Sequence, residues 1–339
     1  MTSNWILETH GDPIGAVRKF VHAVWENEKL EKMLVPTNGG SSLNFQPFVL
    51  DNPKQLKDIN PFRPLMTSNA ARFVPELVNQ KPVRRIGTML RPCEMRALSE
   101  MAKRDSFSKD NLLTICVDCL GTYPVEEYNW RVDRKGTPER LEQETLQFAR
   151  QGGVVPYRYR SACQMCTSPN ATDADINIGV IGLHVREYVL VSVKDEKAAE
   201  RLQTDKFTDC KADEAVVQQR DKLVAKLVER NGRVRERIRQ GLTDILPSDV
   251  SELANQLSQC DRCQKCLEIC PICSVHFPKR GSDGIYIKED MVNWLISCSG
   301  CGMCEQACPR RLPLSAIFTY IRHQLAGPYG YINENTSIH

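Results

Sequence analysis

The chain has 339 residues, more than one small hydrophobic core usually organises, so two domains are expected. Its composition, 41% hydrophobic and 26% charged, is typical of a globular protein. A net charge of +3 gives no reason to expect binding to nucleic acid or to an anionic membrane. The first residues lack the basic and apolar regions of a secretory signal, and no apolar run approaches the roughly 18 residues that span a bilayer. We therefore expect a cytoplasmic protein without a membrane span.

The first 200 residues are predicted to mix helices and strands. Apolar residues spaced by three and four predict an amphipathic helix over 14–34. A helix from Pro92 to about Lys103 follows a strand, because proline suits a first helical turn. The predicted strands cover residues 83–90, 112–117, 176–183 and 188–193. This pattern indicates an α/β or α+β domain.

A second, mostly helical domain is predicted after residue 245. A long charged helix covers 213–245 and presents a solvated face, and Asp249 then provides an N-cap for the next helix. Further helices are expected over 287–297 and 312–325. The predicted organisation is a first domain of residues 1–245, a second domain of residues 246–325, and an extended tail of residues 326–339.

Fifteen cysteines are the unusual feature of the composition. A reducing cytoplasm disfavours structural disulfides, so clustered cysteines there are typical of metal ligands or redox groups. Nine of the fifteen lie between positions 260 and 308. The second domain is therefore predicted to bind metal.

Residues 260–271 and 298–309 both have the spacing C-x₂-C-x₂-C-x₃-C-P of bacterial ferredoxins. In that motif three thiolates hold one [4Fe–4S] cluster and the fourth reaches the neighbouring cluster. Zinc is the alternative for any C-x₂-C pair, but two complete runs favour iron–sulfur. The extra thiol of Cys273 is either an alternative ligand or a buried, inert thiol. The predicted ligand sets are Cys260, Cys263, Cys266 and Cys308 for one cluster, and Cys298, Cys301, Cys304 and Cys270 for the other.

Four cysteines of the first domain give a weaker signal. Cys163 and Cys166 form a C-x₂-C pair that alone fits a zinc half-site, a redox dithiol or coincidence. Cys93 lies at a helix start, where the helix dipole stabilises a thiolate, and Cys119 follows a strand. Four thiolates from separate loops could hold a third cubane. Two cysteines are then left as core thiols, Cys116 and Cys210.

These motifs together resemble a known family. Segments 90–98, 119–122 and 163–182, followed by the two ferredoxin-type runs, occur in the order found in the coenzyme F-420 hydrogenase/dehydrogenase beta-subunit family. The resemblance is greater to formate dehydrogenase beta subunits, because the dicluster region is C-terminal. It implies that Cys93, Cys119, Cys163 and Cys166 ligate a third [4Fe–4S] cluster. It also implies FAD, and exchange of hydride with a carrier such as coenzyme F-420.

Seven residues are candidate flavin contacts. The strand-to-helix turn at Thr88, Arg91 and Pro92 suits a phosphate, although Arg91 could equally form a surface salt bridge. Where the family often has two glycines in its first helix, this chain has only Gly15, and Ser168 replaces an acidic residue. Both departures fall near the expected flavin. The remaining candidates are Arg158 and Arg160, which suit an anionic tail but are more often solvated, and Asp175, which suits a cap near the third cluster.

The expected function follows from how these groups handle electrons. A flavin accepts a hydride as two electrons, whereas cubane clusters carry one electron each. The partner would be the catalytic subunit of a hydrogenase, a formate dehydrogenase or a heterodisulfide-reductase-type complex, since the chain has no pterin or molybdenum signature. The alternative is a non-catalytic iron–sulfur adaptor that has lost flavin, which the single Gly15 and Ser168 favour.

Overall fold

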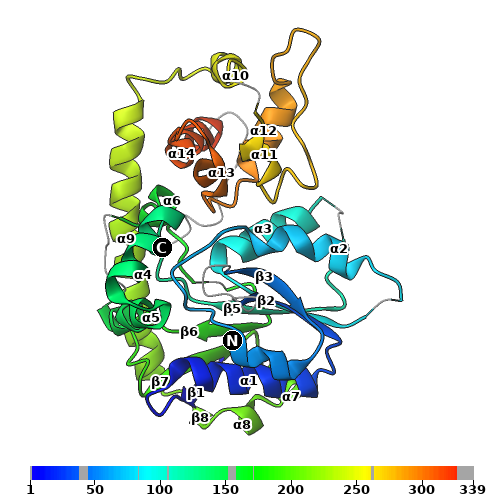
Figure 1. Ribbon diagram of the computed structural model, residues 1–339, viewed down its shortest axis with the longest axis vertical. Helices are drawn as coiled ribbons and strands as arrows, with labels where there is room; N and C mark the ends of the chain where they lie inside the picture. Colours follow the sequence, from blue (N-terminus) through cyan, green and yellow to red (C-terminus); the bar gives the residue numbers. More distant parts are fainter. Residues whose placement is uncertain are drawn as a thin grey trace.

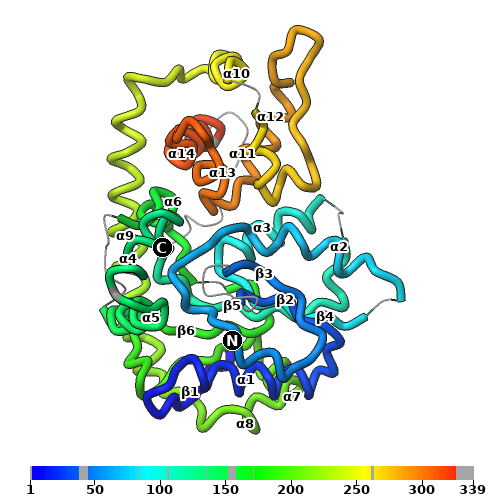
Figure 2. The backbone as a smooth tube through the Cα atoms, in the orientation of Figure 1, coloured from blue at the N-terminus to red at the C-terminus, as the bar shows by residue number. Residues whose placement is uncertain are grey.

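The computed structural model describes residues 2–37, 45–82, 84–104, 107–151, 158–170, 172–260 and 263–326. A β-sheet with covering helices forms one end of the molecule, and a group of short helices forms the other (Figure 1). The long helix α9 (Glu214–Leu242) runs beside the first part and leads into the second, as the backbone trace in Figure 2 shows. Nearly all of the predicted tail lies outside the described residues.

The sheet has eight strands in the order β3-β2-β4-β5-β6-β7-β1-β8. Its central strands β2, β4, β5 and β6 are parallel, and the strands on either side pair antiparallel. Parallel strands need crossover connections, which α3 supplies between β4 and β5. The strand bounds are Ser3–Glu8 (β1), Lys32–Thr37 (β2), Gln46–Leu50 (β3), Ile86–Leu90 (β4), Leu112–Val117 (β5), Ile176–Gly179 (β6), Tyr188–Val193 (β7) and Cys210–Lys211 (β8).

Helices cover both faces of the sheet. In β5, Leu113 and Ile115 face one hydrophobic cluster with α1, whereas Leu112 and Cys116 face another with α3, as the two-residue period of a strand requires. The helices associated with the sheet are α1 (Pro13–Asn27), α2 (Val74–Val78), α3 (Pro92–Ala102), α4 (Val125–Lys135), α5 (Pro138–Gln147), α6 (Ser161–Gln164), α7 (Glu196–Leu202) and α8 (Thr204–Phe207), with 3₁₀ turns at Pro53–Asp58, Ala70–Phe73 and Ala149–Gln151.

The described residues of the second part form five helices: α10 (Val250–Ser258), α11 (Lys265–Glu268), α12 (Lys288–Ile296), α13 (Met303–Ala307) and α14 (Leu314–Ala326). Asp249 caps α10 as predicted, since its carboxylate accepts from the backbone N–H groups of Ser251 and Glu252. The two predicted domains do not have separate hydrophobic cores. One cluster of buried side chains continues from Leu98 and Met101 of α3 to Trp294 and Phe318 of the second part.

Two predicted elements end earlier than expected. The helix predicted over 14–34 stops at Asn27, and the chain turns at Lys29 (φ 50°) before the buried strand β2. β6 ends at Gly179, and the carboxylate of Asp118 accepts from the backbone N–H groups of the next two residues, Val180 and Ile181. The strands at 112–117 and 188–193 and the helix from Pro92 are confirmed.

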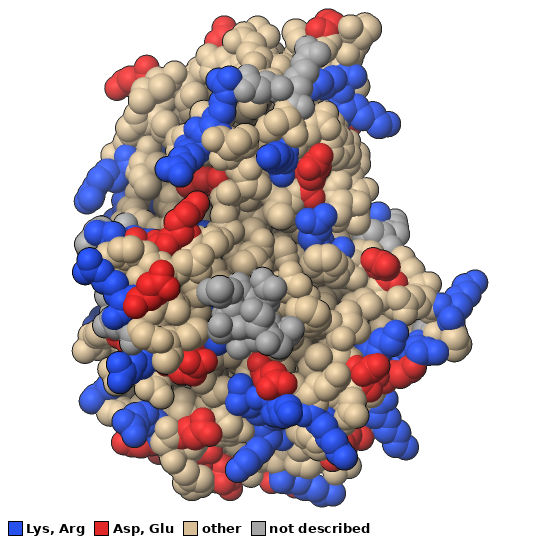
Figure 3. Space-filling model, viewed as in Figure 1, with Lys and Arg blue, Asp and Glu red and all other residues tan. Residues whose placement is uncertain are grey.

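The outer surface carries basic and acidic side chains interspersed over the face that Figure 3 shows, in keeping with the small net charge. Within the described part of the chain, no helix combines the length and apolar character needed to cross a bilayer.

Candidate iron–sulfur sites

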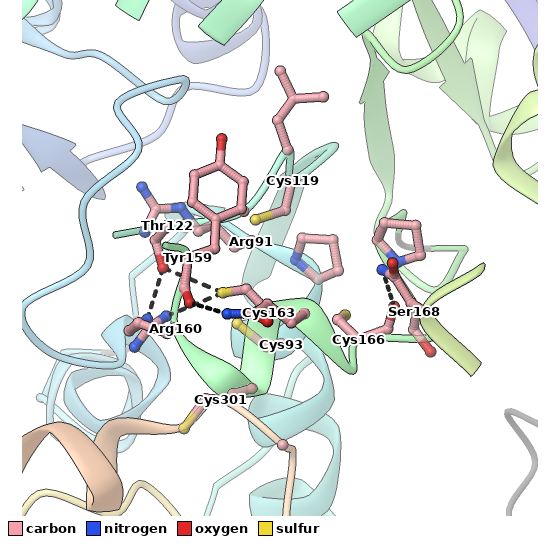
Figure 4. Close-up of a pocket in the computed structure, with 18 of the residues that line it drawn as sticks. Arg91, Cys93, Cys119, Thr122, Tyr159, Arg160, Cys163, Cys166, Ser168 and Cys301 are labelled. Carbon is pink, nitrogen blue, oxygen red and sulfur yellow. Dashed lines mark hydrogen bonds between the residues drawn. The ribbon is translucent and has the colours of Figure 1, made fainter. Parts of the chain in front are cut away.

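The four candidate cysteines of the first domain line one cavity, although they come from three separate segments. Cys93 is the second residue of α3, Cys119 follows β5, and Cys163 and Cys166 lie in and just after α6. A fifth cysteine, Cys301 from the second ferredoxin-type run, also lines this cavity. Figure 4 shows the sulfurs of Cys93, Cys119 and Cys163 turned toward the same space.

Backbone and side-chain contacts hold these segments together. Cys119 donates its backbone N–H to the carbonyl of Pro169, which ties the strand exit to the loop after Cys166. The preceding Asp118 is bonded to Arg220 of α9 at 2.8 and 3.0 Å in a buried ion pair. On the same helix, the Asn231 amide donates to the Cys166 carbonyl at 2.8 Å. The long charged helix therefore positions the cysteine loops, a role that its sequence did not reveal.

Charge distinguishes Cys163 from its neighbours. Burial raises the pKa of Cys93 well above its usual value and that of Cys119 to about 11. Burial acts on Cys163 too, but the Arg160 guanidinium and a hydrogen bond with Thr122 outweigh it and lower its pKa. Arg160 also donates to Thr122 Oγ1 at 2.8 Å and lies 3.8 Å from the Cys163 sulfur. Thiols grouped in this way become thiolates together only when a cation compensates their charge, as metal binding does.

The first ferredoxin-type run surrounds a second cavity. Cys260, Cys263 and Cys266 line it, and Cys308 joins them from the second run, 42 positions beyond Cys266. The apolar side chains of the wall include Leu257, Trp294, Ile317 and Phe318. Burial and the neighbouring thiols of Cys260 and Cys263 raise the pKa of Cys266 to about 11.

The second run meets Cys270 of the first. Burial raises the pKa of Cys304 well above its usual value, and the thiols of Cys298, Cys301 and Cys270 raise it further. A hydrogen bond with the buried Cys273 lowers the pKa of Cys270 to about 7. The structure thus brings together both groups of four that the ferredoxin spacing predicted, with one cysteine exchanged between the runs.

The three groups suit clusters in number and chemistry. Among the described residues, no three His, Cys, Asp or Glu side chains lie close enough to hold a single metal ion. A cubane of four irons and four sulfides is larger than one ion, so its thiolates lie farther apart. Of the other cysteines, Cys116 is buried as expected, whereas Cys210 is exposed on the edge strand β8, so its prediction as a core thiol is wrong.

The seven candidate flavin residues do not gather at one site. Only Arg91, Pro92 and Arg160 line the first-domain cavity, and Arg91 already donates to the carbonyl of Arg63 at 2.7 Å. Gly15 lies in the first turn of α1, on the opposite face of the sheet, and its N–H donates to Asp12. The others have structural partners or lie in the core: Arg158 pairs with Glu127, Asp175 accepts from Thr114, and Thr88 is buried in β4. Together these residues do not fit a flavin cradle.

Three arginines of the site were not identified from the sequence: Arg96, Arg235 and Arg322. They line a cavity that lies between Cys166 of the first domain and Cys298 and Cys304 of the second. Their positions 96, 235 and 322 share no motif, so only the fold reveals that they belong together.

Part of this chain is similar in sequence to known proteins. Residues 83–216 match the family model for the C terminus of the coenzyme F420 hydrogenase/dehydrogenase beta subunit. F420-dependent formate dehydrogenase 1 subunit beta from Methanococcus maripaludis is 29% identical over 139 residues, which is 35% of this chain and 36% of that protein. The chain therefore matches little more than a third of the length of this curated relative.

The fold also has a solved counterpart. One chain of the xenon-derivatised F420-reducing NiFe hydrogenase complex from Methanosarcina barkeri superimposes with a TM-score of 0.51 at 12% identity, covering 72% of this chain and 94% of that chain. This likeness shows a shared fold, and the family model matches the sequence of residues 83–216 alone. Over residues 83–216 the chain is similar to the coenzyme F420 hydrogenase/dehydrogenase beta-subunit family.

Proposed function

We propose that this chain is an iron–sulfur electron-transfer subunit of a hydrogenase- or formate-dehydrogenase-type oxidoreductase in the cytoplasm. The observation that carries the proposal is the exchange of cysteines between the two runs. Cys308 lies with Cys260, Cys263 and Cys266, and Cys270 lies beside the thiols of the other run. Zinc ribbons pair neighbouring C-x₂-C motifs and have no need of this exchange, whereas dicluster ferredoxins require it.

Three [4Fe–4S] clusters are part of the proposal. Each cluster, when bound, accepts or releases one electron. Cys93, Cys119, Cys163 and Cys166 would hold the first, and the two exchanged sets would hold the others. The protein's own contribution is to keep each set of thiols together, to exclude water from the buried sets, and to place positive side chains such as Arg160 beside them.

The sites differ in their access to solvent. Cys260 and Cys263 are exposed, whereas Cys301 is buried against the first domain. We infer that electrons pass between the first-domain site and the Cys301 site inside the molecule, and reach a catalytic partner at the exposed Cys260 site. The partner would act on hydrogen, formate or a comparable donor, as the relatives' names suggest.

The flavin is the least supported part of the family's chemistry in this chain. FAD would connect a hydride carrier such as coenzyme F-420 to the clusters. The dispersal of Gly15, Arg158 and Asp175 favours the second candidate function, an adaptor that carries electrons through clusters alone.

Anaerobic purification with metal and sulfide analysis tests the proposal directly. About twelve iron and twelve acid-labile sulfur atoms per chain are expected. A content near eight atoms of each would show that the first-domain cluster is absent, and zinc without sulfide would overturn the proposal.

Denaturation of the chain and of its native complex separates the two candidate functions. Release of FAD at about one per chain supports hydride exchange. Flavin-free preparations that do not bind added FAD support the adaptor.

A further inference from the structure

Arg96 occupies the junction between the two domains. It lies on α3, three residues after Cys93, and its side chain reaches across to the second ferredoxin-type run. Nε and Nη2 donate to the carbonyl of Ser299 at 3.2 and 3.0 Å, and Nη1 donates to the carbonyl of Ser168 at 3.0 Å. One guanidinium therefore joins three cysteine-bearing segments: the start of α3, the loop after Cys166, and the loop between Cys298 and Cys301.

The bonds of Arg96 to these carbonyls leave its positive charge available to the thiolates. The described residues that line the adjacent cavity include no Asp or Glu. The negative charge that best balances this arginine is therefore that of the cysteine sites on either side.

Two further arginines share the cavity. Arg322 of α14 donates to the carbonyl of Cys298 at 2.8 Å, and Arg235 of α9 makes a long contact of 3.5 Å with Thr167 Oγ1. Burial lowers the pKa of Arg235, and the charge of Arg322 lowers it further. Three like charges around one cavity repel each other unless negative charge lies close by. Thiolate-ligated clusters on both sides would supply that charge.

We propose that Arg96, supported by Arg235 and Arg322, raises the reduction potentials of the two cluster sites that face each other across the domain junction. Its hydrogen bonds also hold these two sites at a fixed distance from each other. A positive charge stabilises the state that has gained one electron, and burial strengthens the effect. Transfer between these sites moves one electron and no proton. The inference rests on the proposed function, because it requires clusters at the Cys93 and Cys301 sites.

The test uses the full-length chain, purified anaerobically, as Arg96→Gln and Arg96→Lys. Arg18→Gln is the matched control, because Arg18 is a half-buried arginine that donates to a backbone carbonyl, that of Ile59, on the opposite face of the sheet. Iron and sulfide are counted first. Each sample is then titrated with dithionite and followed by electron paramagnetic resonance, which gives the potential of each one-electron step.

Arg96→Gln is expected to keep its iron and to lower the potentials of two steps, while Arg18→Gln leaves all of them unchanged. The step of the Cys260 site should move least, since none of its four cysteines lines the arginine cavity. Arg96→Lys keeps the charge but cannot bond both carbonyls in the same geometry. Because the charge is kept, the reduction potentials of Arg96→Lys should stay close to those of the wild-type chain.

Unchanged potentials in an iron-replete Arg96→Gln chain would overturn the inference. If Arg96→Gln loses its clusters, the same potentials are measured in Arg235→Gln, because Arg235 makes only a long contact and contributes mainly charge. Lowered potentials in that variant support the inference, and unchanged potentials reject it. Phosphate that stabilises the wild-type chain but not Arg235→Gln, with potentials unmoved, would show an anion site instead. A wild-type chain without acid-labile sulfide would reject the proposed function, a separate outcome.

Discussion

The two ferredoxin-type runs have the same spacing but different surroundings. In the first run Cys260 and Cys263 are exposed. In the second, Cys301 is 8% exposed and packs with Met66 of the first domain, and Ser299 accepts the hydrogen bonds of Arg96. The same cysteine spacing therefore occurs once at the surface and once inside the molecule.

The backbone confirms that the runs are local repeats. The residue before the short helix of each run has a left-handed conformation, Gln264 with φ 57° before α11 and Gly302 with φ 69° before α13. Only at Gly302 does another element press on the backbone: a Cβ there would lie 2.5 Å from Cβ of Ala162 in α6. The comparison teaches that the loop geometry is local, whereas the role of each run depends on what packs against it.

The largest effect is expected from removing iron and sulfide. The second domain consists of short helices around cysteine-lined cavities, and the free energy of binding the proposed clusters there would contribute to folding. Chelation under denaturant should abolish protection from hydrogen exchange in α10 to α14 while the central strands β4 and β5 keep theirs. Full protection of α10 to α14 in the iron-free chain would show that the apolar core alone maintains them.

The second-largest effect is expected from substituting single cysteine ligands, which distinguishes the two cluster sites. Cys308→Ser should remove the exposed cluster although Cys308 belongs to the second run, and Cys270→Ser should remove the buried one. Each variant should lose about four of twelve iron atoms, and different reduction steps should disappear. Cys210→Ser is the control, since Cys210 is exposed on β8 and should leave iron unchanged. Loss of the same step in both variants would contradict the exchange.

Gly302→Ala should weaken the contact between the second run and α6. The added methyl group meets Ala162 at 2.5 Å, and the left-handed backbone adds strain. A destabilisation of about 2–3 kcal/mol in the free energy of unfolding is expected from denaturant titration. Gly300→Ala is the matched control, because Gly300 also has a positive φ of 67° but a Cβ there meets nothing within 4 Å. Equal losses in the two variants would leave backbone strain as the only cause.

The smallest effect is expected from Gln264→Gly in the first run. Glycine adopts the left-handed conformation without the steric cost that Gln264 bears, although it also gives the unfolded chain more freedom. The net gain should be about 0.5–1 kcal/mol by the same titration, with iron content unchanged. A destabilised Gln264→Gly variant would mean that the glutamine side chain contributes contacts at the cavity that outweigh the strain.

Features that depend on near neighbours along the chain could be predicted from the sequence. Cysteine spacing predicted that cysteines of the two runs lie together in exchanged groups, and short apolar, β-branched runs located β5 and β7 to the residue. The Asp249 cap was equally readable, because its partners lie two and three positions away. These features follow from bond geometry over a few residues, so a local pattern is enough to predict them.

Other features depend on packing between distant segments and emerged only from the folded chain. Among them are the burial of the second run, the approach of Cys301 to the first-domain cavity, and the separation of Gly15 from the turn at Arg91. The first helix stopped at Asn27, where burial of β2 prevailed over helical periodicity. Arg96 and Ser299 are 203 positions apart, and no spacing rule connects them. Such contacts arise when hydrophobic faces of distant segments pack into one core, a property of the whole chain that no short segment contains.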